Sequence, residues 1–335
     1  MVKQNFYLTT DGELRRKDNT LYFENSEGKR ILPIENIDSI YVFSTLRLNN
    51  RALEFASYKK VPIHFFNYYG TYVGSYYPRE RLVSGYLLLK QVEYYTDMNK
   101  RIDIAREFVD GGISNIQKNL YSLQTKIDSN EITEIRGQIQ EGQNLLKDMT
   151  TIEELMGLEG SVRKKYYDAI DIYMLHTNRE YVMDGRVKRP PNNKMNSLIS
   201  YGNSMMYATI LNEIYKTQLN PTISYLHELQ DRRFSLSLDV SEVFKPFIVD
   251  RIIFRLIGLN MLDNSCFEEL EGICYLSTKG KRKFIQEYDE RLKTTIRHRK
   301  LNRKVSYLRL IRLELYKLIK HLIGETKYIS FKIWW

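Results

Sequence analysis

Short apolar runs of strand-like length dominate residues 1–77. Turn-forming residues separate these runs, and Asp11-Gly12 is the first such turn. Residues 46–60 depart from the pattern, because their apolar positions share one face of a short helix that Asn49 or Asn50 can cap. The predicted strands are residues 4–10, 21–24, 29–33, 39–43, 61–67 and 71–77.

After about residue 82 the apolar spacing becomes helical and stays so. We expect one long helix over 82–109 that ends at Gly111-Gly112, and a later helix opened by Asn196. The other predicted helices span residues 113–126, 132–147, 151–174, 197–215, 249–262 and 281–323. The fold class is therefore α+β: a small, β-rich, sandwich-like N-terminal domain (1–77), a linker (78–84) and a large all-helical domain (85–335). Short strands leave sheet edges that need cover, so we expect the β domain to serve dimerisation.

Chemistry-bearing residues cluster within residues 223–250, where His227 is followed by Asp239 and Glu242. The two acids are three residues apart, so they share one face of a helix. Pro246 has no N–H and cannot bond the carbonyl oxygen of Glu242, so we expect the helix to bend or to begin there. The segment starting at His227 resembles the zinc-protease motif HExxH but lacks its second histidine. The cluster suits either a metal site or a structural network.

Two further segments carry candidate chemistry. Glu159 and Arg163 are four residues apart and share a helix face, and taken alone they form a surface ion pair. Residues 187–196 contain two consecutive prolines and cannot continue a helix, so they form an extended, basic loop. One interpretation is that this loop binds a substrate phosphate group through Lys188 and Arg189. The alternative is an ordinary connection between helices.

Positive charge is concentrated near the end of the chain. The formal net charge is +10, and residues 279–320 contain 15 Lys or Arg against 4 Asp or Glu. Such a cluster indicates a polyanionic partner, and we favour nucleic acid over a merely solvated surface. No apolar run is long enough to span a membrane, and the first residues lack the core of a signal peptide. With only two cysteines in addition, we expect a cytoplasmic protein.

Several common catalytic motifs are absent from the sequence. There is no glycine-rich phosphate loop, no dinucleotide-binding glycine triplet and no serine nucleophile elbow. One imidazole with two or three carboxylates is a mixed nitrogen and oxygen ligand set, which suits Mg²⁺ or Mn²⁺. Such an ion can polarise a phosphodiester and activate a hydroxyl group. From composition and spacing alone, a metal nuclease remains one hypothesis beside a structural role for the same residues.

The order of several motifs resembles one known family. These motifs are GLEG (157–160), RPPNNKMNSLISYG (189–202), NPTISYLHE (220–228) and RRFSLSLDVSEVFKPFIVD (232–250). Together they resemble the CRISPR-associated integrase and endonuclease of spacer acquisition, the first-numbered Cas protein. The final Tyr328, Phe331 and Trp334-Trp335 look like members from type I-B systems.

The resemblance implies a homodimer with a divalent-metal site in each helical domain. The implied metal-binding and catalytic residues are Glu159, His227 and Glu242, supported by Asp239 and Arg163. The implied cofactor is Mg²⁺ or Mn²⁺. The loop and the basic cluster supply the expected DNA contacts: Lys188, Arg189, Asn196, Lys245, Arg297, Arg299, Lys300, Arg303 and Lys304.

The implied reaction inserts short foreign DNA, the spacer, into a CRISPR array. A 3′-hydroxyl group attacks a phosphodiester at the leader–repeat junction, and the same site cleaves branched DNA. The implied partner is the second-numbered Cas protein, which bridges two dimers in a heterohexamer. Two alternatives stay open. One is a structure-specific nuclease of DNA repair; the other is a non-catalytic DNA-binding scaffold whose acids only pair with Arg163, Arg232 and Arg233.

Overall fold

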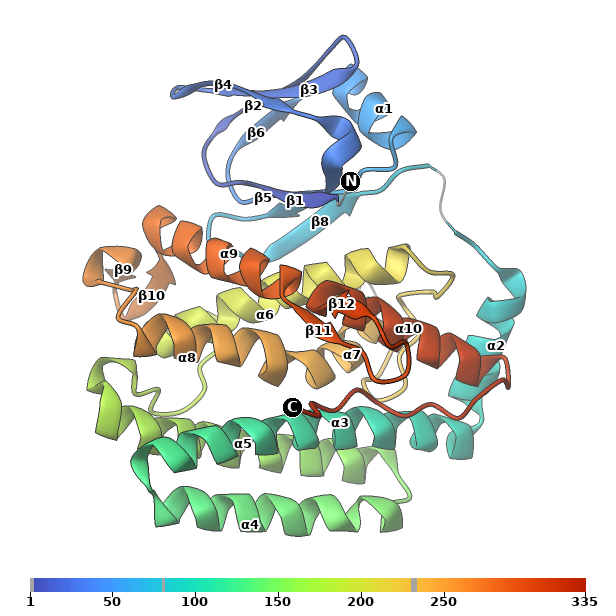
Figure 1. Ribbon diagram of the computed structural model, residues 1–335, viewed down its shortest axis with the longest axis vertical. Coiled ribbons are helices and arrows are strands. Elements are labelled where there is room, and N and C mark those ends of the chain that lie inside the picture. Colours follow the sequence, from blue (N-terminus) through green and yellow to red (C-terminus); the bar gives the residue numbers. More distant parts are fainter. Residues whose placement is uncertain (1–2, 80–81, 230–233) are drawn as a thin grey trace.

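The computed structural model describes residues 3–79, 82–229 and 234–335. Strands make up the first part of the chain and helices most of the remainder, so the predicted α+β class is confirmed (Figure 1). Residues 80–81 of the expected linker lie outside the described residues. So do Arg232 and Arg233, the proposed alternative partners of the acids.

Within the described residues, the β-rich part contains two four-stranded sheets. The first has the order β1-β5-β7-β8, in which β1, β5 and β7 are parallel and β8 is antiparallel to β7. The second has the order β4-β3-β2-β6, with β6 parallel to β2 and the other pairs antiparallel. The strands are β1 (Gln4–Leu8), β2 (Gly12–Lys17), β3 (Thr20–Asn25), β4 (Gly28–Leu32), β5 (Ile37–Val42), β6 (Leu46–Leu48), β7 (Ile63–Phe66) and β8 (Tyr72–Tyr76).

Strands β2 and β6 were not expected from the sequence. Strand β2 has the sequence GELRRK, in which Leu14 alone is buried. The alternation of apolar and polar residues that predicts a strand is therefore almost absent. The predicted turn at Asp11-Gly12 leads directly into it. The short helix α1 (Asn50–Tyr58) is confirmed, and the side chain of Asn49 caps it by accepting a hydrogen bond from the backbone N–H of Ala52.

The helical part places α7 in the interior, packed against both α3 and α6. In Figure 1, helices α3, α4 and α5 form the layer farthest from the sheets, and α6, α8, α9 and α10 lie between that layer and the sheets. The helices are α2 (Gly85–Thr96), α3 (Met98–Ile127), α4 (Asn130–Asn144), α5 (Ile152–Thr177), α6 (Lys194–Tyr215), α7 (Ser235–Lys245), α8 (Arg251–Gly258), α9 (Thr278–Lys293) and α10 (Tyr307–Leu322). Two small hairpins interrupt them: β9 (Phe267–Leu270) with β10 (Ile273–Leu276), and β11 (Thr295–Arg297) with β12 (Lys304–Ser306).

Two helix boundaries correct the prediction at the start of the helical part. The helix expected over 82–109 is divided at Asp97, whose side chain caps α3 by accepting hydrogen bonds from the N–H groups of Asn99 and Lys100. Gly111-Gly112 does not end a helix but lies within α3. Packing of other segments against this glycine pair outweighs its low helix propensity.

Two further boundaries differ near the candidate site. Asn193, not Asn196, caps α6, because the Asn193 side chain accepts the hydrogen bond from the Asn196 N–H. The basic segment expected as one helix over 281–323 is α9, the β11–β12 hairpin and α10. The hairpin interrupts the helical apolar spacing for too few residues to be read from the pattern.

A chain of alternating charges joins the β-rich part to the helices. Asp38 on β5 pairs with Lys216, which lies 3.0 Å from a carboxylate oxygen of Glu213 on α6. Arg312 on α10 binds the other oxygen of Glu213 at 2.6 Å. The Glu213 side chain is fully buried, so its two cations compensate a charge that burial alone would disfavour. Among the described residues, no helix has the length and apolarity needed to cross a membrane.

Candidate functional site

Arg163 joins the two helices that carry the predicted acids. Glu159 and Arg163 lie one turn apart on α5, and the Arg163 Nε and Nη2 atoms are 3.2 and 3.1 Å from Oε1 of Glu159. The same guanidinium donates from Nη2 to Oε2 of Glu242 on α7. The predicted pair on one helix face is therefore present, but its arginine is largely buried and shared with a third residue.

Glu242 is buried and ionised. Lys245, three residues later on α7, lies 2.6 Å from Oε1 of Glu242, while Arg163 binds its other oxygen. Burial alone would raise the pKa of Glu242, but Lys245 and Arg163 outweigh it and lower the pKa to about 2. At neutral pH the site therefore holds a permanent buried anion between two cations.

Asp239 fixes the position of His227. Its carboxylate accepts hydrogen bonds from the backbone N–H groups of Tyr225, Leu226 and His227, at 2.6, 3.1 and 3.0 Å. It also lies 2.8 Å from Nδ1 of His227. A carboxylate only accepts, so Nδ1 donates, and Nε2 is the ring nitrogen left to bind a ligand. Burial would lower the pKa of His227, but Asp239 and Glu242 raise it overall.

The helix carrying Glu242 changes geometry one residue after Lys245. Residues Pro246–Asp250 form a π-helical segment before α8 begins. The predicted irregularity at Pro246 is confirmed, although Glu242 lies in the last turn of α7 and not at the start of a helix. Such segments arise where the regular i to i−4 bonding is interrupted, and they are frequent at functional sites.

A buried pair beside Arg163 was missed from the sequence. The hydroxyl of Tyr166 donates to Oδ2 of Asp250 at 2.9 Å, and Asn119 on α3 donates to the Tyr166 oxygen at 3.0 Å. Burial raises the pKa of Asp250 to about 6, against the opposing effect of Arg163. The available signal was Tyr166, which lies one turn after Arg163 on the same helix face.

The donor chemistry of this cluster fits a divalent cation. Two carboxylates from different helices converge on one guanidinium, so the site already holds a cation between Glu159 and Glu242. An imidazole with its Nδ1 held by a carboxylate is the usual arrangement of a metal-binding histidine. In this conformation, however, no three His, Cys, Asp or Glu side chains of the described residues lie close enough together to hold a metal. A metal ion would need Arg163 to release at least one acid.

The predicted basic loop before α6 is present, and its residues divide into two groups. Lys188 and Arg189 are exposed. Asn196 is buried, and its side chain bonds to the backbone at Val187 and Gly185 and to the side chains of Arg186 and Asn192. In this conformation Asn196 shapes the loop from inside and presents no free polar atom to DNA.

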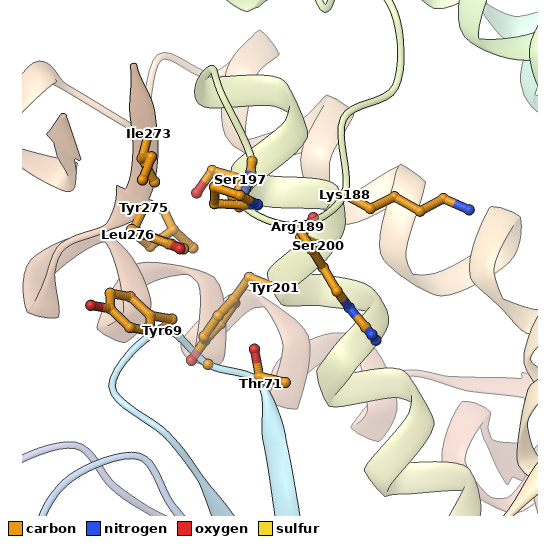
Figure 2. Close-up of a pocket in the computed structure, with 13 residues that line it drawn as sticks. Tyr69, Thr71, Lys188, Arg189, Ser197, Ser200, Tyr201, Ile273, Tyr275 and Leu276 are labelled. Carbon is orange, nitrogen blue, oxygen red and sulfur yellow. The ribbon is translucent and has the colours of Figure 1, made fainter. Parts of the chain in front are cut away.

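A cavity of about 410 Å³ lies beneath this loop. Its lining combines the loop with the β7–β8 turn, α6 and β10 (Figure 2). The rings of Tyr69 and Tyr275 contact each other there, with centroids 4.3 Å apart. Figure 2 shows the Lys188 side chain extending away from these tyrosines. Arg186 donates to the hydroxyl of Ser200, one of the lining residues, at 2.9 Å.

Apart from Lys245, the remaining predicted DNA contacts lie on the β11–β12 hairpin, and their side chains are exposed. Arg297 is held by Asn302 Oδ1 at 2.7 Å, and Arg299 donates to the backbone oxygen of Trp334 at 3.1 Å. Lys245 differs from this group, because it is mostly buried and paired with Glu242. The hairpin residues concerned are Arg297, Arg299, Lys300, Arg303 and Lys304.

Comparison with known proteins gives concordant results. The family model described as CRISPR associated protein Cas1 matches residues 6–290. The CRISPR-associated endonuclease Cas1 2 of Thermodesulfovibrio yellowstonii is 48% identical, and the match covers 100% of both chains. The solved structure of a Cas1 protein from Thermotoga maritima has a TM-score of 0.86 and 40% identity, and covers 98% of this chain and 100% of that one. A casposase bound to integration product has the same fold, with a TM-score of 0.86 at 19% identity over 98% of this chain and 92% of that one.

Proposed function

This chain belongs to the Cas1 family of CRISPR-associated proteins, and on that basis we propose that it is a metal-dependent DNA endonuclease and integrase that inserts spacers into a CRISPR array. The observation that carries the proposal is the convergence of Glu159 and Glu242 on one cation, with His227 nearby. An ordinary surface ion pair does not bury one of its acids or share its arginine with a second helix.

The proposed metal ligands are Glu159, His227 through Nε2, and Glu242. Mg²⁺ or Mn²⁺ held there would supply Lewis-acid stabilisation of a phosphodiester. Asp239 keeps the imidazole in the tautomer and orientation that ligation needs. Lys245 and Arg163 contribute positive charge beside the acids, where a phosphate oxygen would otherwise be repelled by them.

The proposed reaction is a phosphodiester exchange. The oxygen of a 3′-hydroxyl group forms a bond to phosphorus and loses its proton to solvent. The bond from phosphorus to the leaving 3′-oxygen breaks, and that oxygen takes up a proton from solvent to become a new 3′-hydroxyl group. One phosphodiester bond replaces another, so no outside energy source is required. Water in place of the hydroxyl group gives hydrolysis, which agrees with the endonuclease name of the full-length relative.

The DNA is proposed to contact the exposed cations of the β11–β12 hairpin together with Lys188 and Arg189. Charges spread along a surface suit the regular phosphates of a duplex. The homodimer, with the β-rich part as its contact, and a heterohexamer with the second-numbered Cas protein remain part of the proposal. We also propose that the protein acts in the cytoplasm, because the CRISPR array is part of the cell's DNA.

A strand-transfer assay with Mn²⁺ tests this function. The wild-type protein is expected to join a labelled duplex to a leader–repeat target, and Glu159→Ala, His227→Ala and Glu242→Ala are expected to abolish joining while DNA binding persists. Glu153→Ala, an exposed glutamate on the same helix as Glu159, is the matched control and should stay active.

The remaining outcomes separate the alternatives. Cleavage of branched DNA without any joining would indicate a repair nuclease. DNA binding with neither reaction would indicate a scaffold. Full activity of all three alanine variants would exclude the proposed metal site.

A further inference from the structure

The last residues of the chain form a partly buried segment without helix or strand. This tail segment, residues 328–335, follows α10 and runs along α3 (Figure 1). Its backbone is held at several points: the Ser330 N–H donates to Glu107 on α3 at 2.9 Å, and the Phe331 N–H donates to Glu314 on α10 at 2.8 Å. Tyr328, Phe331 and Ile333 are buried.

One buried asparagine on α3 binds both the tail segment and the helix of Glu242. The Asn115 Nδ2 atom donates to the backbone oxygen of Val243 at 2.9 Å and to that of Phe331 at 3.2 Å. Its Oδ1 atom accepts from the Ile333 N–H at 2.8 Å. Val243 is the neighbour of Glu242, so the tail segment is connected through a single side chain to the backbone beside a proposed ligand.

The glycine pair inside α3 allows both segments to approach the same turn. A Cβ atom on Gly111 would lie 2.6 Å from Oγ of Ser330 in the tail segment. A Cβ atom on Gly112 would lie 3.2 Å from the backbone oxygen of Glu242. The tail segment therefore packs against Gly111, and α7 packs against the next residue, Gly112.

Aromatic rings complete the contact. The Phe331 ring stacks on Phe244 of α7, with centroids 5.2 Å apart and an interplanar angle of 9°. It also lies 5.3 Å from Phe247, whose ring contacts Trp335 at 5.5 Å. Phe244 and Phe247 flank Pro246, where the backbone hydrogen bond of a regular helix is missing. The tail segment thus packs across the point where α7 ends and the π-helical segment begins.

We propose that the tail segment is a positioning element for the proposed catalytic centre, with Phe331 as its main residue. It fixes the rotation of α7 about its axis, and with it the direction of Glu242 and Lys245. This inference rests on the proposed function. Loss of the Phe331 ring lets the end of α7 shift, and displacements of about 1 Å at reacting groups lower rates steeply.

A purely structural role would give a different result, because general loss of packing lowers stability without a specific effect on turnover. The test therefore compares Phe331→Ala with Lys332→Ala in the full chain. Lys332 is the next residue, is exposed and pairs with Asp110, away from α7. Four quantities are measured below the melting temperature: kcat and KM for a branched DNA substrate, DNA affinity without metal, and Mn²⁺ affinity by titration calorimetry.

We expect Phe331→Ala to lower kcat at least about tenfold and to weaken Mn²⁺ binding, while KM and metal-free DNA affinity change by less than about twofold. Lys332→Ala should match the wild type. A Phe331→Ala protein with wild-type kcat and Mn²⁺ affinity would overturn the inference, even if its melting temperature were lower.

Phe331→Leu covers the case in which the alanine variant does not fold. It keeps an apolar side chain but loses the stacked ring, and a reduced kcat is again the expected result, whereas an unchanged kcat contradicts the inference. A wild-type protein without any metal-dependent reaction would instead contradict the proposed function, so the two failures are distinguishable.

Discussion

Asp239 binds Nδ1 of His227 at 2.8 Å while the same carboxylate accepts three backbone N–H groups. We expect Asp239→Asn to reduce cleavage by about 10- to 100-fold, the usual effect of losing such a partner of a metal-binding histidine. Asparagine has one acceptor oxygen and cannot satisfy all four donors, so the melting temperature should also fall. Activity assays and thermal melting of Asp239→Asn check both effects. Asp168→Asn, an exposed acid on α5, is the control, and equal activity of the two variants would contradict the role of Asp239.

Arg163 competes with any cation for Glu159 and Glu242. Removing its charge should leave Glu159 without this cation and Glu242 with Lys245 alone, so Arg163→Met is expected to melt earlier in EDTA and to bind Mn²⁺ about tenfold more tightly. Calorimetric titration with Mn²⁺ measures the affinity. Lys164→Met, an exposed neighbour on α5, is the matched control. Weaker Mn²⁺ binding by Arg163→Met would mean that the guanidinium does not occupy the place of the metal.

His64 predicts a loss of stability in acid. Its ring is buried on β7 beside Ser75, and burial lowers its pKa to about 3. The unfolded chain has a histidine pKa near 6.5, so between the two values it binds one more proton than the folded protein. The free energy of unfolding should therefore decrease as the pH falls from about 6.5, by at most about 1.4 kcal/mol per pH unit for this group.

The control for this effect is a pair of substitutions. Urea unfolding at several pH values should show a shallower pH dependence for His64→Asn than for the wild type. His176→Asn, which changes an exposed histidine on α5, should keep the wild-type dependence. Parallel curves for all three proteins would show that His64 is not the group responsible.

The β11–β12 hairpin should determine how strongly DNA binding depends on salt. Charge reversal of Arg299, Lys300 and Arg303 to glutamate is expected to weaken binding and to reduce the slope of log affinity against log salt concentration. Each lost phosphate contact lowers that slope by about 0.9. The same reversal at the exposed residues Lys17, Lys118 and Lys164 is the control for total charge. Equal slopes for the two triple variants would mean that the hairpin is merely solvated.

The spacing of apolar residues predicted those strands and helices whose pattern is visible within the segment itself. The strands with alternating or continuous apolar residues were predicted, whereas β2 was missed because Leu14 is its single buried residue. The division at Asp97 was missed because helix-forming residues continue on both sides of it. From local sequence Gly111-Gly112 predicts a helix end, because the segments that pack against the pair come from far along the chain.

In the candidate site, too, residues close together in the sequence could be grouped, whereas contacts between distant segments could not be predicted. Their closeness in the sequence marked His227, Asp239 and Glu242 as one cluster, but the contact of His227 with Asp239 is seen only in the structure. Only the resemblance to a family connected Glu159 to that cluster. The pairing of Tyr166 with Asp250 joins residues on different helices, and no periodicity within either segment encodes it.

The partly buried charges of Asp38, Lys216 and Arg312, together with the fully buried Glu213, constrain which sequences can share this fold. Removing one member leaves an odd charge at the junction of the sheet with two helices, so a single neutral substitution there is costly. Two opposite charges can be lost together at much smaller cost. Related sequences should therefore change at these positions in compensated pairs, and a variant such as Asp38→Asn should be rescued by a second substitution that neutralises Lys216.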